Sequence, residues 1–259
     1  MILAPTLSLN TPARGYDADA TAFAAASGAT DVAALSAFVK GVKELGLWDS
    51  MVCWPLRSTQ NAGTGDTVYS LGGLGTYDGT RVNAPAWGAD GITFDSAGTE
   101  HITTALDVAG LRKFTAMVAT DPGTYSNLDA MLGAWGTTNY LAMRRSSATS
   151  IDFIVSSGGT KTLAISGRSE DWRVYGWGTQ GVNTIATESG AQIGTTAFVP
   201  DQTGSQTLNI GILATPTNSP YNGVIAWVMF TKDAELTTAQ QLSVYTLYKS
   251  TLGTGLGLP

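Results

Sequence analysis

The sequence predicts an all-β domain: a jelly-roll sandwich of two antiparallel sheets, with an N-terminal amphipathic helix and a short C-terminal helix. Short apolar or alternating runs recur along most of the chain between clusters of Gly, Asn, Asp and Ser, which is typical of strands joined by tight turns. The 259 residues include 31 glycines, and only 13% are charged. Helical spacing of apolar residues is confined to one stretch near each end.

The N-terminal third of the chain divides into two segments. Residues 1–30 mix Pro, Gly and Ala without a sustained period, so we expect an extended arm that becomes ordered by lying on this domain or on a neighbour. Residues 31–84 comprise a helix and a connecting segment. The helix is predicted over residues 31–46 because apolar side chains recur there at helical spacing, at Val32, Leu35, Phe38, Val39, Val42 and Leu45.

Residues 85–259 are predicted to form the jelly-roll domain. The expected strands lie at residues 91–94, 114–119, 131–134, 140–143, 151–155, 162–165, 172–177, 192–194, 208–213 and 224–230. The stretch SSGGT at 156–160 is the clearest hairpin turn. Thr237 and Gln240 have the spacing of a capping box and predict a final helix, after which GTGLGLP forms a flexible or partner-bound tail.

Composition excludes several classes of protein. The net charge of −6 and the pI near 4.6 disfavour nucleic-acid binding, because the chain offers no cationic surface for phosphates. The lone Cys53 excludes an internal disulfide and a thiolate zinc site. No apolar run is long enough for membrane insertion, and Pro5 and Ser8 interrupt any signal-like segment, so we expect a protein made in a cytoplasm without a signal peptide.

Four segments resemble the concanavalin A-like or laminin G-like jelly roll. They are WGADGITFDSAGTEHITT, KFTAMVAT, DWRVYGWGTQGVNTIATESGAQIG and the closing unit from Leu208 to Tyr248. The match spans roughly residues 85–250. A second resemblance covers residues 31–80, where ALSAFVKGVKELGLWDSMVCWPLRS is similar to the helix and Trp-Asp segment that often precedes such jelly rolls in virion proteins of tailed bacteriophages, including tail-fibre-like proteins.

Catalytic patterns are weak in this sequence. The single histidine, His101, has only Glu100 beside it as a partner nearby in the sequence, so a structural role is the simpler interpretation. The jelly rolls that hydrolyse glycosides use paired carboxylates on one face of a strand. The adjacent pair Glu170 and Asp171 would point to opposite faces of a strand, so we expect no enzyme activity.

Two kinds of binding site remain open. Asp121, Asn127 and Asp129 lie in one connection and carry the oxygen ligands that calcium prefers, although an ordinary turn would use the same residues. Calcium is the one cofactor that the sequence suggests. Sugar recognition would use aromatic faces and polar rim residues, for which the candidates are Trp135, Tyr140, Arg144 and Trp177.

The aromatic residues between positions 172 and 177 cannot all face solvent. Trp172 should face opposite to Tyr175 and Trp177 if the three share a strand, so at least one of the two sets belongs to the core. Arg144 and its neighbour Arg145 could contact a ligand at the rim, or could lie in a solvated hairpin turn.

The resemblance implies a non-enzymatic virion protein of a tailed phage, either a capsid decoration protein or head fibre or a tail-fibre-like component, made in the host and located in the virion. The arm of residues 1–30 would bind other virion proteins, the lectin-like jelly roll would attach to host-surface glycan, and a homo-oligomer is expected. The alternative is an adhesin module whose main role is carbohydrate binding. A glycoside hydrolase is a third hypothesis.

Overall fold

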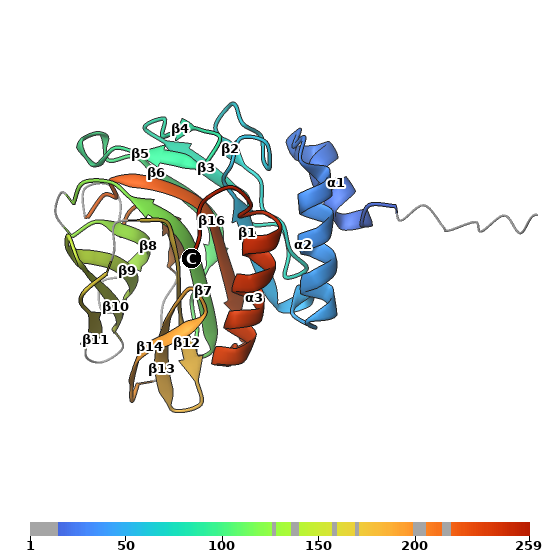
Figure 1. Cartoon of the computed structure of the whole chain (residues 1–259). Coiled ribbons are helices and arrows are strands. Elements are labelled where there is room, and N and C mark those ends of the chain that lie inside the picture. Colours follow the sequence, from blue (N-terminus) through green and yellow to red (C-terminus); the bar gives the residue numbers. More distant parts are fainter. Residues whose placement is uncertain are drawn as a thin grey trace, which may run out of the picture.

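The protein is a sandwich of two antiparallel sheets with a layer of helices on one side, which confirms the predicted fold class (Figure 1). The computed structural model describes residues 15–125, 128–135, 140–156, 160–168, 171–198, 206–213 and 219–259. Asn127 and most of the predicted turn at 156–160 lie outside these residues. Within them, the helices are α1 (Ala18–Ser27), α2 (Val32–Glu44) and α3 (Thr238–Ser250), with short 3-10 helices η1 (Trp48–Ser50) and η2 (Ser96–Gly98).

Sheet A has the strand order β14-β13-β12-β7-β16-β5-β4, and β1 also pairs with β16. Its strands are β1 (Met51–Pro55), β4 (Ala86–Trp87), β5 (Ile92–Phe94), β7 (Phe114–Pro122), β12 (Arg173–Gln180), β13 (Asn183–Glu188), β14 (Ala191–Thr196) and β16 (Gly223–Lys232).

Sheet B has the order β11-β10-β9-β8-β15-β6-β3-β2. Its strands are β2 (Thr67–Val68), β3 (Gly79–Val82), β6 (His101–Asp107), β8 (Ala130–Trp135), β9 (Tyr140–Ser147), β10 (Ser150–Ser156), β11 (Thr160–Ile165) and β15 (Thr207–Ile210). The segment 31–84 therefore supplies more than a helix and a connection, because it contributes β1 to sheet A and β2 and β3 to sheet B.

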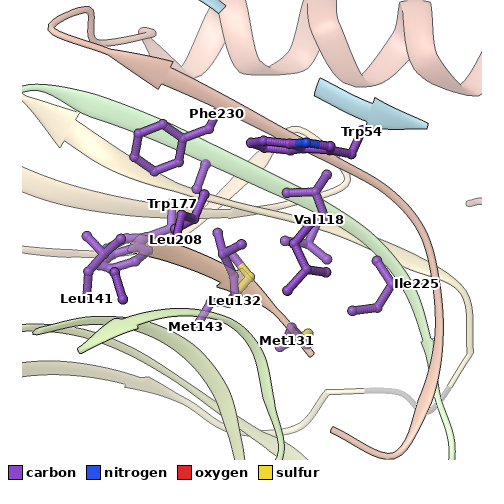
Figure 2. Packing of buried hydrophobic residues seen from close by; sticks show 14 of the residues in the cluster. Trp54, Val118, Met131, Leu132, Leu141, Met143, Trp177, Leu208, Ile225 and Phe230 are labelled. Atoms are coloured by element: carbon purple, nitrogen blue, oxygen red, sulfur yellow. The ribbon is translucent and has the colours of Figure 1, made fainter. Parts of the chain in front are cut away.

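The main core fills the space between the two sheets. Apolar residues from alternate positions of both sheets meet there, including Trp54, Val118, Leu132, Trp177 and Phe230 (Figure 2). Alternate side chains of a strand point to opposite faces, so one strand can serve two cores. In β1, Val52 and Trp54 enter this core.

A second core lies between sheet A and the helices. Trp227 of β16 packs edge-to-face against Phe38 of α2 at 5.8 Å and stacks on Tyr248 of α3 at 4.6 Å between ring centroids. A bulge in β16 after Ile225 turns both Ala226 and Trp227 toward the helices. Sheet A is therefore buried on both faces, which explains the nearly continuous apolar sequence of β16. Truncation of such a buried Trp to Ala costs about 3–5 kcal/mol.

The capping box at the start of α3 is confirmed. Gln240 N–H donates to the Thr237 hydroxyl at 3.2 Å, and Thr237 N–H donates to the Gln240 side chain at 3.0 Å. Further along α3, the Gln241 side chain accepts a hydrogen bond from Thr187 of β13 at 2.8 Å. This bond passes over Gly176 of β12, where a Cβ would lie 2.2 Å from the Thr187 hydroxyl oxygen. Glycine is required at this point for α3 to reach the sheet.

The chain ends differ from the expectation in two places. Within the predicted extended arm, Ala18–Ser27 forms α1, which buries Ala20, Phe23 and Ala24. The tail expected to be flexible or partner-bound instead packs on the helix layer, since Leu256 and Leu258 are buried. In both places a few apolar side chains pack against a surface that distant segments form, so the local sequence pattern does not predict the contact.

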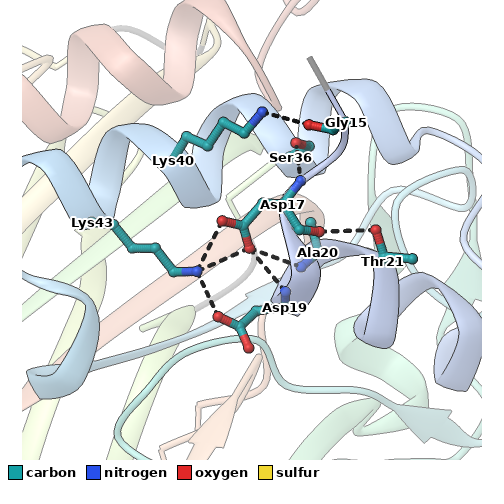
Figure 3. Close-up of polar contacts among 8 residues, drawn as sticks. All are labelled: Gly15, Asp17, Asp19, Ala20, Thr21, Ser36, Lys40 and Lys43. Carbon is teal, nitrogen blue, oxygen red and sulfur yellow. Dashed lines mark hydrogen bonds and ion pairs between the residues drawn. The ribbon is translucent and has the colours of Figure 1, made fainter. Parts of the chain in front are cut away.

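Asp17 fixes the start of α1 against α2 (Figure 3). Its carboxylate caps the helix by accepting hydrogen bonds from the N–H groups of Asp19 and Ala20. The Lys43 ammonium lies 2.9 Å from the Asp17 carboxylate and 2.6 Å from that of Asp19. The Lys40 ammonium donates to the carbonyl of Gly15 at 2.9 Å. We call the contacts of Lys43 with Asp17 and Asp19 the Lys43 clamp.

Candidate functional site

The outer face of sheet B is the sheet face on which surface binding residues can lie. The helices cover the outer face of sheet A, and the inner faces of both sheets form the main core. In β9, Leu141 and Met143 point into that core, so Tyr140, Ala142 and Arg144 point outward. In β8, Ala134 points inward and Trp135 outward.

Trp135 and Tyr140 form a stacked aromatic pair on this outer face. They are directly opposite each other in the β8–β9 register, and their ring centroids are 4.4 Å apart with an interplanar angle of 23°. Trp135 is 42% exposed, while Tyr140 is partly buried behind it. The Tyr140 hydroxyl lies 3.2 Å from the hydroxyl of Thr160 on β11. The pair thus presents one exposed indole whose orientation is supported from behind.

Leu213, which follows β15, packs on the outer face of sheet B close to Tyr140. Gly133 of β8 allows this, because a Cβ there would lie 2.6 Å from the Cα of Leu213. Leu213 packs onto the outer face with Ala142 and Ile154 in a small apolar cluster, and Tyr140 packs against the same cluster. Tyr140, the partner of Trp135, is therefore packed both against the indole and against this cluster.

Arg144 lies on the same face, two positions beyond Ala142. It is opposite Asp152 of β10, and its guanidinium is 3.4 Å from the Asp152 carboxylate. Asp152 also accepts a hydrogen bond from the Ser146 hydroxyl at 2.9 Å. The Arg144 Nε is buried and has no hydrogen-bond partner among the described residues. Arg144 and Asp152 together offer donors and acceptors with no net charge.

The prediction that Trp177 contacts a sugar is corrected by its position. Its side chain is fully buried between the sheets, with its ring 4.8 Å from that of Phe114 in an edge-to-face arrangement. Tyr175 shares this core, whereas Trp172 packs on the helix side of sheet A. The predicted opposition of Trp172 to Tyr175 and Trp177 is therefore confirmed, and the set that includes Trp177 is core.

The residues suggested for calcium are placed as follows. Asp129 is completely buried, and its carboxylate lies 3.4 Å from the guanidinium of Arg145, which is itself only 2% exposed. Asp121 is half-buried in β7, and its pKa is raised by burial and by the nearby charges of Asp171 and Asp90. In the described ranges, no three His, Cys, Asp or Glu side chains are grouped around a possible metal position. The calcium site stays a prediction.

The two groups considered for catalysis, His101 and Asp171, lie in different environments, since one is buried and the other is exposed. The His101 ring is buried, with Nδ1 2.9 Å from the carbonyl oxygen of Thr99. Asp171 is highly exposed and lies 3.8 Å from Arg173, while Glu170 is outside the described residues. Neither contact places a second reactive group beside His101.

Two hollows in the surface were not anticipated from the sequence, because each collects residues from distant segments. One, of about 570 Å³, lies between α2 and α3 and is lined by Leu45, Leu242 and Leu247 among others. The other, of about 300 Å³, lies between α1, η1 and residues 69–78. No helix in the described part of the chain has both the length and the apolar character to cross a bilayer.

Comparison with known proteins identifies similar folds. No protein-family model matches the sequence, and no curated protein matches it. Domain 4 of the extracellular arabinanase AbnA from Geobacillus stearothermophilus, solved in complex with arabinotriose, matches with a TM-score of 0.50 at 11% identity, over 75% of this chain and 87% of that one.

The binding domain of botulinum neurotoxin serotype D also matches, with a TM-score of 0.54 at 9% identity. The match covers 76% of this chain and 52% of that one, so this chain corresponds to about half of the toxin domain. At such identities the two likenesses show a shared sandwich fold.

Proposed function

We propose that this chain is a carbohydrate-binding module and that a glycan binds on the outer face of sheet B at Trp135. The observation that carries the proposal is the indole of Trp135, which is 42% exposed and stacks on Tyr140. It lies on a sheet face that the helices leave open. Sugar rings present C–H faces that pack on aromatic rings, and hydroxyl groups beside the ring bind polar side chains.

The neighbouring groups suit a neutral glycan. The Tyr140 and Thr160 hydroxyls lie beside the indole, and the Arg144–Asp152 pair lies further along the same face of β9. Residues at positions 140 and 144 of one strand are about 13 Å apart, which corresponds to a glycan of a few sugar units. The fold shared with a domain solved in complex with arabinotriose supports the same class of ligand.

The test is a binding screen of the full chain against a glycan panel that includes arabino-oligosaccharides, with and without calcium. We expect a saturable ligand, and we expect Trp135→Ala to weaken its binding by about tenfold or more, as removal of an aromatic hot spot does. The matched control is Tyr16→Ala, which removes an exposed aromatic side chain before α1 and should leave binding unchanged.

Two results would contradict the proposal: no glycan bound under either calcium condition, or equal binding by the Trp135 and Tyr16 variants. The same panel can be assayed for released reducing ends, which separates binding from glycoside hydrolysis. We expect the glycans to remain intact.

On the sequence resemblance alone, we further propose that the module is displayed on a phage virion as a homo-oligomer. The structure changes how this is tested, because Gly15 and Asp17 contact α2 and belong to the fold. The deletion should therefore remove only residues 1–14. Loss of incorporation into particles, seen by immunogold electron microscopy, supports the proposal. Normal incorporation, or no label on wild-type particles, contradicts it.

A further inference from the structure

The hollow between α1 and the sandwich, which we call the α1 pocket, has a lining unlike that of the groove between α2 and α3. Its volume is about 300 Å³. Aromatic rings reach it from three segments: Phe23 from α1, Trp48 from η1 and Tyr69 from the chain before β3. The carboxylates of Asp19 and Asp78 also line it. Aromatic rings and carboxylates together are the groups that surround organic cations in proteins.

The walls of the α1 pocket are fixed by close contacts. Gly72 lies against β1, where a Cβ would come within 2.2 Å of the Met51 carbonyl oxygen, and a Cβ on Gly73 would lie 2.7 Å from the Trp48 indole. Two glycines thus let residues 69–78 approach β1 and Trp48. On the opposite wall, the Lys43 clamp holds Asp19 and the start of α1 in place (Figure 3).

The charges around the α1 pocket are unbalanced. The ammonium of Lys43 is shared by two carboxylates, those of Asp17 and Asp19. The Asp78 carboxylate is held through one oxygen by the N–H and the hydroxyl of Ser70, at 2.8 and 3.0 Å. Within the described ranges, Asp78 has no ion pair with a Lys or Arg. An anionic ligand would meet repulsion here, and a cation would be attracted.

The protein itself shows that the indole accepts a cation. The Lys43 ammonium lies 5.1 Å from the centre of the Trp48 ring, a distance at which a cation is attracted to the ring face. Lys43 is restrained by its two carboxylates and is not among the residues that line the pocket, whereas Phe23, Tyr69 and Asp78 line it beside Trp48.

We propose that the α1 pocket binds an organic cation of alkylammonium or guanidinium type, with Trp48 and Tyr69 as the aromatic walls and Asp78 as the counter-charge. This site is separate from Trp135, because it is formed by α1, η1 and residues 69–78 on the helix side of the molecule. The same chemistry is offered by a free quaternary ammonium compound and by an arginine side chain of a partner.

The test uses NMR of the full chain and follows the indole N–H signal of Trp48, assigned with the Trp48→Phe variant. Choline is titrated against its neutral isostere 3,3-dimethyl-1-butanol, and N-acetyl-arginine amide is titrated in a second arm. We expect saturable shifts with the cations and none with the isostere. The tighter of the two cations identifies the source of the ligand.

Asp78→Asn is the informative variant, because its amide oxygen can still accept both hydrogen bonds from Ser70 while the charge is removed. We expect cation binding to weaken by about fivefold, and to weaken also in high salt. The control is Asp171→Asn, an exposed carboxylate just before β12, which should bind as the wild type does. Equal binding of the neutral isostere, or equal affinity in the Asp78 and Asp171 variants, would overturn the proposal.

Discussion

Asp129 and Arg145 form an ion pair that is removed from solvent between the sheets. Asp129 is 0% exposed and Arg145 is 2% exposed. Arg145 also donates to the Gly123 carbonyl at 2.7 Å and lies 5.3 Å from the centre of the Tyr125 ring. Because both groups are removed from water, the stability of each charge depends on the opposite charge beside it.

We predict that Asp129→Asn lowers the free energy of unfolding by about 3–5 kcal/mol, because it removes the carboxylate charge that faces the buried Arg145 guanidinium. Urea denaturation measures the change. The matched control is Asp66→Asn, which breaks the surface pair with Arg81 at 3.1 Å and should cost about 0–1 kcal/mol. Equal effects of the two substitutions would show that burial of the pair is not important.

Asp121 and Asp17 should respond to pH in opposite directions. Burial and the charges of Asp171 and Asp90 raise the pKa of Asp121 above its ordinary value of 3.8. For Asp17, burial acts to raise the pKa, but hydrogen bonds from Lys43 and from the N–H groups of Asp19 and Ala20 outweigh it and lower the pKa. The charged form of Asp121 therefore destabilises the fold, and the charged form of Asp17 stabilises it.

We predict that Asp121→Asn stabilises the protein at pH 7 and that this gain disappears as the pH falls below 3.8, where the carboxyl is protonated in both states. Asp17→Asn keeps the helix cap but should destabilise at pH 7, and this loss should shrink as the pH falls through the lowered pKa of Asp17. Thermal melts at a series of pH values measure both. The same sign for the two variants would contradict the assignment.

At the scale of elements, the Lys43 clamp joins α1 to α2. Lys43→Met keeps the aliphatic part of the side chain and removes the charge that holds Asp17 and Asp19. We predict faster hydrogen exchange across Ala18–Ser27, equivalent to about 1–2 kcal/mol, with little change in the sheets. Lys40→Met is the control, because among the described residues the Lys40 ammonium bonds to the carbonyl of Gly15, which lies outside α1. Equal exchange in the two variants would show that α1 is held by apolar packing alone.

Elements with a strong periodic pattern could be predicted from the sequence. The apolar spacing of Leu35, Phe38 and Val42 locates α2, and Thr237 with Gln240 marks the start of α3. In contrast, α1 is mostly alanine and contacts α2 through few large side chains, so its sequence has no clear helical face. The strand β1 was not anticipated, because MVCWP is buried on both faces and does not alternate.

The candidate site was predictable only in part. Trp135 and Tyr140 stand in strand-like sequence, but only the β8–β9 register shows that they stack on an outward face. Trp177 has a similar local sequence and is in the core, since the choice between faces depends on how the two sheets pack. The α1 pocket has no local signal, because Phe23, Trp48 and Tyr69 come from segments that meet only in the fold.

At the scale of the whole molecule, the helix layer and the sandwich form one fold, and the two surfaces that we propose for binding are separate. The helices bury the central strands of sheet A, and they leave the outer face of sheet B to Trp135, Tyr140 and Arg144. Arg57, just after β1, holds the C-terminal segment against the sandwich by donating to the carbonyls of Leu252 and Thr254. We therefore propose the glycan site on sheet B and the cation site on the helix side.

The most direct measurement of the central claim is an NMR titration of the full chain with the best glycan from the panel, followed on the indole N–H signals of its seven tryptophans. Trp54, Trp177 and Trp227 are fully buried and serve as internal controls. We predict a saturable shift of the Trp135 signal, with no shift of Trp48. A saturable shift of the Trp48 signal, or saturable binding that leaves the Trp135 signal unchanged, would contradict the account.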